Sequence, residues 1–177
     1  MGGAGTDTDD IQRSIYFHEV IDKYPDIKVV RKLAFYDMGK AATIVEDWFT
    51  ANPNTDAIYN NSSWVYLPPE REVLKKIGKW KQIGDPNHVV ITGHDASNFV
   101  LNAIANGFVD MTLGNAFHTT AKPFASIVMQ YLKTGVAPKI GDRFVTGMPD
   151  YKYADIVAVP TLLGPVFMLE GIVITKA

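Results

Sequence analysis

The sequence predicts an α/β fold, in which a three-layer arrangement places helices on both faces of a parallel sheet. The first observation is that two hydrophobic periodicities alternate along the chain. Stripes of helical spacing alternate with short β-branched or apolar runs typical of strands, which are Ile27–Ala34, Ala57–Asn60, His88–Thr92 and Met111–Leu113. The second observation is that these runs are nearly all apolar, as strands covered on both faces must be. Together they indicate parallel strands joined by helical crossovers.

Helical stripes surround and separate the expected strands. The clearest stripe has apolar residues at i, i+3, i+4, i+7 and i+8, and it consists of Ala41, Ile44, Val45, Trp48 and Phe49. Three other stripes run from Phe17 to Tyr24, from Val100 to Ile104 and from Ala121 to Leu132. Pro25 ends the first of them, and Asn106-Gly107 is a C-cap signal at the end of the second.

Two regions modify this simple alternation. Pro68-Pro69 is expected to delay the helix after the second strand, so that it covers Glu70–Ile77. Residues 136–177 are expected to form an irregular tail, with terminal strands at Ile156–Val159 and Ile172–Thr175.

The chain opens on a helix rather than on a strand. Gly2–Asp7 has the composition of a turn and cap that leads into this helix. A Gly-rich turn that feeds a helix normally follows a strand. We therefore expect the sheet to lack its first strand.

Length and composition favour one domain and exclude several function classes. A chain of 177 residues with 47% hydrophobic content predicts a single lobe over residues 1–177. Its net charge of −2 argues against nucleic-acid binding, and the absence of cysteine excludes disulfides and thiolate sites. The N-terminal residues have no signal-peptide pattern, and the apolar stretch Ile156–Thr175 contains two prolines, so we expect no membrane helix.

Polar residues follow the expected strands, at the sheet edge where open α/β sheets bind ligands. Candidate ligand-binding residues at this edge are Arg13, Tyr36, Ser62, Asp95 and Asn115. A carboxylate, an arginine fork, amides and an aromatic face suit a polyhydroxyl ligand. No cofactor, metal ion or catalytic residue is expected.

Several segments of the sequence resemble those of a known protein family. The segments "RSIYFHEVIDKYPDIKVV", "TANPNTDAIYNNSSW" and "HVVITGHDASNFVLNAIANGFVDMTLGN" resemble the carboxy-terminal lobe of type I periplasmic sugar-binding proteins. These are receptors of bacterial ABC importers, similar to ribose-binding protein, and their lobes are flavodoxin- or Rossmann-like. The resemblance runs from about Gly2 to Gly135, and its strongest piece is the Gly-x-Asp turn after the VVIT strand.

The resemblance implies roles for individual residues. An arginine in the opening helix, matched by Arg13, contacts the sugar, and an aromatic matched by Tyr36 packs on its ring. Asp95 matches the Gly-x-Asp carboxylate, and Asn115 takes the place of a family glutamine. The family's Asn-Asp pair falls on Ser62-Ser63, which is a departure from the pattern.

The resemblance also implies a function and partners. The chain is expected to be a non-catalytic receptor lobe that binds a monosaccharide or polyol and serves an ABC permease from a periplasmic or extracytoplasmic location. The amino-terminal lobe of such a receptor is expected to be missing. The effector-binding core of a LacI-type transcriptional regulator is the alternative, since it shares the fold, and a flavodoxin-like or sugar-processing enzyme is a third.

Each candidate residue also has a purely structural interpretation. Asp95 could cap a helix that begins near Ala96, and Arg13 could be a solvated surface residue. Tyr36 could be a core or rim aromatic, while Ser62 and Asn115 could be turn formers. The acidic run Asp7-Thr8-Asp9-Asp10 is better explained by the helix dipole than by a metal site, and no nucleophile motif supports a Ser62–His94–Asp95 triad.

Overall fold

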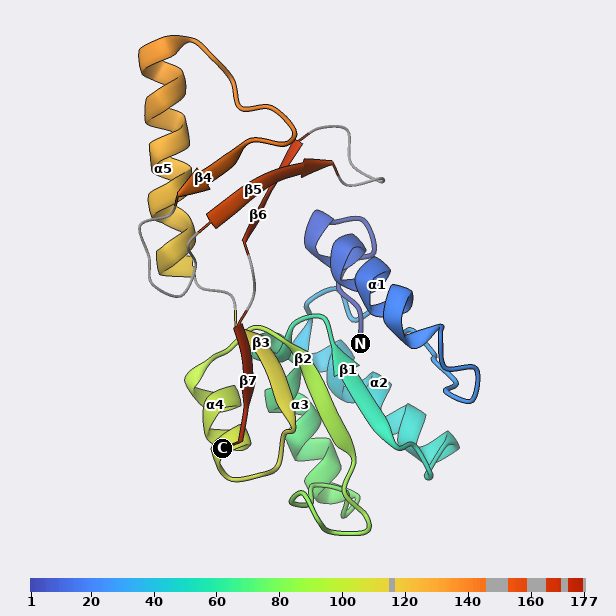
Figure 1. Ribbon diagram of the computed structural model, residues 1–177. Helices are drawn as coiled ribbons and strands as arrows, with labels where there is room; N and C mark the ends of the chain where they lie inside the picture. The colour runs from blue at the N-terminus through green and yellow to red at the C-terminus, as the bar shows by residue number, and fades with distance from the viewer. Residues whose placement is uncertain (115–116, 146–152, 159–164, 170–171, 177) are drawn as a thin grey trace. The chain divides into compact units, whose positions relative to one another are not determined.

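The computed structural model confirms the α/β class and the parallel sheet (Figure 1). It describes residues 1–114, 117–145, 153–158, 165–169 and 172–176. The chain forms two compact units, one of Met1–Gly114 with Val173–Ala177 and the other of Asn115–Ile172. The expectation of a single lobe over residues 1–177 stays a prediction.

The first unit is built on a four-stranded sheet of order β1-β2-β3-β7. Its strands are β1 (Ala57–Asn60), β2 (Val90–His94), β3 (Met111–Gly114) and β7 (Ile172–Thr175). β1 and β2 pair in parallel from Ala57↔Val90 to Asn60↔Gly93, and β2 and β3 pair in parallel from Thr92 to His94. The carboxyl ends of three strands therefore share one edge.

Helices α2 (Met38–Ala51), α3 (Ser63–Lys76) and α4 (Asn98–Ala105) lie on one face of this sheet, and α1 (Thr8–Ile21) lies beside the end of β1 (Figure 1). α2, α3 and α4 form one layer, in which α3 packs against α2, α4, β1 and β2. α1 packs near the end of β1, where Phe17 stacks on Tyr59 with ring centroids 4.2 Å apart. This arrangement agrees with the predicted α/β fold of a parallel sheet packed against helices.

The hydrophobic core lies between the sheet and the layer of α2, α3 and α4. It is formed by side chains that are almost fully buried, and its largest members are Phe49, Leu67, Leu74, Val89, Ile91, Val100, Ile104 and Val109. Full burial of each large side chain contributes about 1.5–3 kcal/mol. The α2 stripe predicted from spacing is confirmed, because Ala41, Val45 and Phe49 are its buried residues.

The second unit contains α5 (Phe117–Thr134) and a three-stranded sheet of order β4-β5-β6. Its strands are β4 (Arg143–Val145), β5 (Tyr153–Ala158) and β6 (Pro165–Leu169), and both pairings are antiparallel. The tail predicted as irregular therefore contains a sheet. The expected terminal strand at Ile156–Val159 overlaps β5, and the one at Ile172–Thr175 is β7.

The expected strand Ile27–Ala34 is absent as a strand. The segment runs beside the chain's first residues, but its only ladder contact is a single parallel bridge between Leu33 and Gly2. A strand requires a partner along its length, and here Met1–Gly3 supplies one at the far end only. Among the described elements α1 comes first, and the residues before it, Met1–Gly3, form that bridge and also bond to the end of β1.

The expected start of α3 is also wrong. The helix begins at Ser63 and passes through Pro68 and Pro69, rather than beginning after them. Each proline removes one intrahelical hydrogen bond. Burial of Tyr66, Leu67 and Glu70 on either side of the prolines holds the helical path in spite of that loss.

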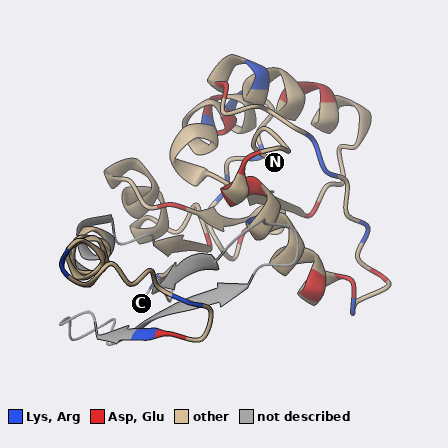
Figure 2. Ribbon diagram, turned by 90° about the horizontal axis from the view of Figure 1, so that it is seen from above, with Lys and Arg blue, Asp and Glu red and all other residues tan. Residues whose placement is uncertain are grey.

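Charges of both signs are distributed over the helices and loops that the structure describes (Figure 2). Their near balance agrees with the net charge of −2. None of the described helices combines the length and the apolar character that a bilayer crossing requires.

Candidate binding site

The site is built around Asp95, which follows β2 at the carboxyl edge of the sheet. Its backbone has a φ of +72°, a left-handed conformation that aspartate tolerates better than most residues. The amide of Asp95 donates to the carbonyl of Leu113 (2.8 Å), and the hydroxyl of Thr112 donates to the Asp95 carbonyl (2.8 Å). β3 therefore fixes the direction in which Asp95 leaves the sheet.

Arg13 reaches Asp95 from α1. Its two terminal nitrogens lie 3.4 and 3.3 Å from Asp95 Oδ2 and Oδ1, a fork on a carboxylate. One of these nitrogens also donates to the carbonyl of Asn61, at the end of β1. Only 12% of the Arg13 side chain and 10% of the Asp95 side chain are exposed, so solvent screens this pair less than a surface pair.

Ser62 completes the contact on the Asp95 carboxylate. It occupies the N-cap position of α3, yet its side chain makes no capping hydrogen bond. Its hydroxyl instead donates to Asp95 Oδ2 at 2.7 Å, and the residue is 4% exposed. The Ser62 hydroxyl is therefore directed at the Asp95 carboxylate rather than at the start of α3.

His94 adds a neutral ring beside this pair. Burial, with a further contribution from the nearby Arg13 charge, lowers the pKa of His94 to about 4. The imidazole is therefore uncharged at neutral pH and offers one donor and one acceptor nitrogen. Its ring meets Tyr59 edge-on, with centroids 6.1 Å apart. We call Arg13, Ser62, His94 and Asp95 the Arg13 cluster.

The sequence-based candidates fare differently in the structure. Arg13, Ser62 and Asp95 are brought together as predicted, while Asn115 lies outside the described residues. Tyr36 is not in contact with them: its hydroxyl donates to Asp7 Oδ1 at 3.0 Å, and its amide donates to the Tyr66 hydroxyl at 3.1 Å. Burial and the Asp7 carboxylate raise the pKa of Tyr36.

The alternative that Asp95 caps the next helix is wrong. α4 begins at Asn98, and its N-cap is Ser97, whose hydroxyl accepts from the amide of Val100 at 3.3 Å. The alternative that Arg13 is a solvated surface residue is also wrong, because its side chain is largely buried and pairs with the side chain of Asp95.

The geometry of Ser62, His94 and Asp95 differs from that of a catalytic triad. The Ser62 hydroxyl donates to Asp95 rather than to His94, so the three residues do not form a nucleophile–base relay. Across the described residues, no cluster of three or more His, Asp or Glu side chains is placed to hold a metal ion.

Sequence reasoning missed the buried anchor that positions α1. Asp10 is fully buried and accepts from the amides of Gly3 (2.6 Å) and Gly5 (2.8 Å) and from the side chain of Asn61. Arg31 forms an ion pair with the same carboxylate. The sequence offered one signal, a carboxylate after a Gly-rich turn. The helix dipole explains every acidic residue of the run Asp7–Asp10 equally well, so it could not single out Asp10 from Asp9.

Known proteins share this architecture. One curated relative, the D-apiose import binding protein of Actinobacillus succinogenes, is 28% identical over 139 residues. That match covers 77% of this chain and 42% of the relative, so the chain spans less than half the length of the relative it matches.

Solved structures show the same fold. A periplasmic solute-binding protein of an ABC transporter from Actinobacillus succinogenes, with bound D-allose, has a TM-score of 0.72 at 15% identity, covering 99% of this chain and 50% of that one. The arabinose-transporter binding protein of Shewanella sp. ANA-3, bound to L-arabinofuranose, has a TM-score of 0.65 at 21% identity, covering 76% and 43%.

A family model fixes the classification. The periplasmic binding protein domain matches residues 1–135, which include both the Arg13 cluster and the three parallel strands that carry it. With three quarters of its length in that match, the chain belongs to the periplasmic binding protein family.

Proposed function

We propose that this chain is the sugar- or polyol-binding part of a solute receptor that serves an ABC importer. The observation that carries the proposal is the Arg13 cluster, in which Arg13 and Ser62 both engage the Asp95 carboxylate at the carboxyl edge of a parallel sheet. This edge is where α/β sheets of this kind bind small ligands.

The chemistry of the cluster matches a row of hydroxyl groups. A carboxylate accepts hydroxyl protons, a guanidinium donates to hydroxyl oxygens, and neutral His94 can do either. The contacts of Arg13 with Asp95, at 3.3 and 3.4 Å, are longer than a strong charge-assisted hydrogen bond. Hydroxyl groups of a ligand can therefore insert between or beside these partners without first breaking an optimal bond.

The relatives support a receptor rather than a regulator or an enzyme. The curated relative is an import binding protein for D-apiose, and two structural neighbours hold D-allose and L-arabinofuranose. A third neighbour, from Bacillus halodurans, holds myo-inositol, which is a polyol. We infer a monosaccharide or polyol as ligand, an ABC permease as partner, and action outside the cytoplasm without catalysis.

A second lobe is part of this proposal. The chain matches 42% of the D-apiose receptor and 50% of the D-allose receptor. We infer that a complementary lobe closes over the Arg13 cluster and supplies the remaining contacts. This chain without that lobe should hold a sugar weakly, because one open face leaves much of the ligand in water.

Saturation-transfer NMR with D-apiose, D-allose, L-arabinose and myo-inositol tests the proposal, because it detects weak binding. We expect at least one of these ligands to bind with a Kd of roughly 1 mM, equivalent to about −4 kcal/mol. Asp95→Asn should abolish the signal, since the amide replaces an acceptor by a donor that faces Arg13 and Ser62.

Asp47→Asn is the matched control, because it removes a carboxylate from the exposed face of α2. Its ligand signals should equal those of the parent chain. Equal signals from Asp95→Asn would contradict the proposed site, whereas nanomolar binding by the unaltered chain would contradict the need for a second lobe.

A further inference from the structure

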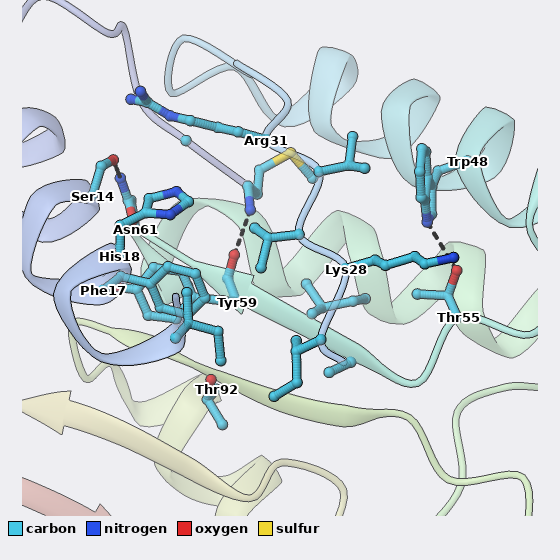
Figure 3. Close-up of a pocket in the computed structure, with 18 residues that line it drawn as sticks. Ser14, Phe17, His18, Lys28, Arg31, Trp48, Thr55, Tyr59, Asn61 and Thr92 are labelled. Atoms are coloured by element: carbon cyan, nitrogen blue, oxygen red, sulfur yellow. Dashed lines mark hydrogen bonds between the residues drawn. The ribbon is translucent and has the colours of Figure 1, made fainter. Parts of the chain in front are cut away.

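The feature that carries a further inference is a row of three aromatic rings that ends at the Arg13 cluster. Phe17 of α1 stacks on Tyr59 of β1, with ring centroids 4.2 Å apart and ring planes 20° from parallel. Tyr59 in turn meets His94 of β2 at 87°, with centroids 6.1 Å apart. Figure 3 shows the stacked rings of Phe17 and Tyr59 in the pocket that they help to line. The row therefore connects α1, β1 and β2.

Each ring is close in sequence to a group that builds the cluster. Phe17 follows Arg13 by four residues, so both side chains leave the same face of α1, one turn apart. His94 directly precedes Asp95. Tyr59 lies two residues before the backbone carbonyl that accepts from Arg13. The row thus joins the same three elements that the contacts of Arg13 join.

The helix that carries Arg13 needs such a contact, because its other attachment lies at one end. In the first turn of α1, the buried Asp10 carboxylate accepts from backbone and side-chain donors. The contacts of Arg13 with Asp95, at 3.3 and 3.4 Å, are too long to hold the helix by themselves. Phe17 supplies a second attachment, about two turns beyond Asp10. Arg13 lies between these two attachments, which together fix where its guanidinium meets the edge of the sheet.

We propose that Tyr59 is a positioning residue of the sugar site, a role that rests on the function proposed above. Its ring holds Phe17 on one side and His94 on the other, and thereby sets the distance between the Arg13 guanidinium and the Asp95 carboxylate. Tyr59 acts through α1 and β2 and not through a contact of its own with the ligand. An aromatic ring suits this role, because stacked and edge-on pairs favour a narrow range of geometries.

His94 reports on the Tyr59 ring without any ligand. Burial, with a further contribution from the Arg13 charge, lowers the pKa of His94 to about 4, while the Asp95 charge acts in the opposite direction. The edge-on contact with Tyr59 supplies part of this burial. Loss of the Tyr59 ring would admit water to the imidazole, so the pKa of His94 should rise toward its ordinary value of 6.5.

Three tyrosine variants test the role. Tyr59→Leu keeps apolar bulk but removes the flat ring, Tyr59→Phe keeps the ring, and Tyr24→Leu is the matched control at a tyrosine that is 56% exposed. Sugar affinity is measured by saturation-transfer NMR with the sugar that the parent chain binds best, in buffer where urea denaturation shows each variant to be folded. We expect Tyr59→Leu to bind about tenfold more weakly, and the other two variants to bind within about twofold of the parent.

Two ligand-free measurements separate positioning from a general loss of stability. The NMR resonances of the Arg13 side-chain Nε–H and the Asp95 carboxyl carbon should shift in Tyr59→Leu and keep their positions in Tyr59→Phe, because the fork follows the ring. The pKa of His94, from the titration of its ring Cε1–H, should exceed about 5 in Tyr59→Leu and stay near 4 in Tyr59→Phe. A residue that only stabilised the fold would change neither measurement in the folded protein.

Phe17→Leu separates the two ends of the row, because it removes the stack on α1 and keeps the contact between Tyr59 and His94. It should weaken sugar binding and shift the Arg13 resonance as Tyr59→Leu does, while the pKa of His94 stays near 4. If Tyr59→Leu does not fold, Phe17→Leu decides the question by itself.

Unchanged sugar affinity in the folded leucine variants of the row would overturn the proposal, and so would unchanged Arg13 and Asp95 resonances. If the parent chain binds none of the sugars, the function proposed above fails. The ligand-free resonances then still decide whether Tyr59 positions the Arg13–Asp95 fork, so the two failures are distinguishable.

Discussion

The two sides of β1 differ in how completely the sheet is built. On the paired side, β2 and β3 provide a continuous parallel ladder, and buried polar groups are satisfied: the hydroxyl of Thr112 donates to the carbonyls of Gly93 (3.1 Å) and Asp95 (2.8 Å). On the other side, which we call the open side, the described residues that bond to β1 and its end are those of the short segment Met1–Gly3. The paired side therefore carries the Arg13 cluster, and the other side carries an apolar groove between β1 and residues 27–31.

The open side also contains buried polar atoms without partners. Asn60 Nδ2 donates to Glu70 Oε2 at 2.7 Å, but Asn60 Oδ1 and Glu70 Oε1 have no hydrogen-bond partner among the described residues. Both residues are fully buried. A protonated Glu70 would supply the donor that these two oxygens lack. This agrees with burial, which raises the pKa of Glu70 to about 7.

The largest expected effect is on the anchor that holds the open side together. Asp10→Ala removes the carboxylate that joins Gly3, Gly5, Arg31 and Asn61, and leaves several donors without an acceptor. We expect a loss of about 4 kcal/mol in the free energy of unfolding, measured by urea denaturation.

Asp9→Ala is the control for this change. The Asp9 side chain is 71% exposed and forms only a 3.7 Å pair with Arg13, so its loss should cost about 0.5 kcal/mol or less. Similar destabilisation by the two variants would show that the acidic run acts through the helix dipole rather than through the buried anchor.

A smaller loss is expected on the paired side, at Gly93. A Cβ atom there would lie 2.4 Å from Ser63 Oγ and 2.5 Å from the carbonyl oxygen of Asn60. Because one of these atoms belongs to the backbone, β1 and β2 must separate to admit it. Gly93→Ala should cost about 2–3 kcal/mol in urea denaturation and shift the amide resonances of Ser62 and Asp95.

Gly39→Ala provides the comparison for this glycine effect. Its Cβ would meet only the exposed side chain of Asp37, at 3.3 Å, and alanine favours the helix by about 0.5 kcal/mol or more. A loss for Gly39→Ala as large as that for Gly93→Ala would contradict the close approach of β1 and β2.

The next prediction concerns pH. The pKa of Glu70 rises from 4.5 to about 7 on folding, so between these values the folded chain keeps a proton that the unfolded chain releases. The stabilising contribution of the protonated group is complete below pH 4.5 and is lost as the pH rises through 7. Glu70→Gln supplies a permanent neutral amide and should be about 2 kcal/mol more stable than the parent at pH 8.

The comparison between pH 5 and pH 8 identifies the cause. Burial lowers the pKa of the Met1 amino group and the Glu70 charge partly opposes this, so acetylation of Met1 in both proteins removes its contribution from the comparison. The stability difference between parent and Glu70→Gln should therefore appear only on raising the pH. Parallel stability curves across this range would contradict a raised Glu70 pKa.

The paired side was predictable from sequence because its signals are local. The limits of β1 coincide with the run Ala57–Asn60, and the buried face of α2 follows from its spacing. The C-cap at Asn106-Gly107 also holds: the Gly107 amide donates to Ile104, and its φ is +74°. The positions of Ser62 and Asp95 followed from one rule, that polar residues after parallel strands share an edge, whereas Arg13 on α1 was singled out by the family resemblance.

The open side was not predictable from local signals. Ile27–Ala34 has strand composition, but a strand exists only if a neighbour supplies hydrogen bonds, and periodicity does not reveal that neighbour. The left-handed backbone of Phe35 and Tyr36 is likewise set by long-range bonds, from the Phe35 amide to Gly3 and from the Tyr36 amide to Tyr66. These bonds direct the Tyr36 hydroxyl to Asp7 instead of Asp95.

The smallest expected effect tests whether the Arg13 cluster needs the planar guanidinium group of Arg13 or only its positive charge. Arg13→Lys keeps the charge, but a single ammonium group cannot contact both oxygens of Asp95 and the carbonyl of Asn61 with the same planar fork. We expect a loss of about 1 kcal/mol in urea denaturation together with weaker sugar binding. Arg71→Lys, on the exposed pair with Glu72, should cost less than about 0.5 kcal/mol and leave sugar binding unchanged. If both lysine variants bind sugar like the parent chain, the guanidinium fork does not determine the site, and charge alone would explain its contribution.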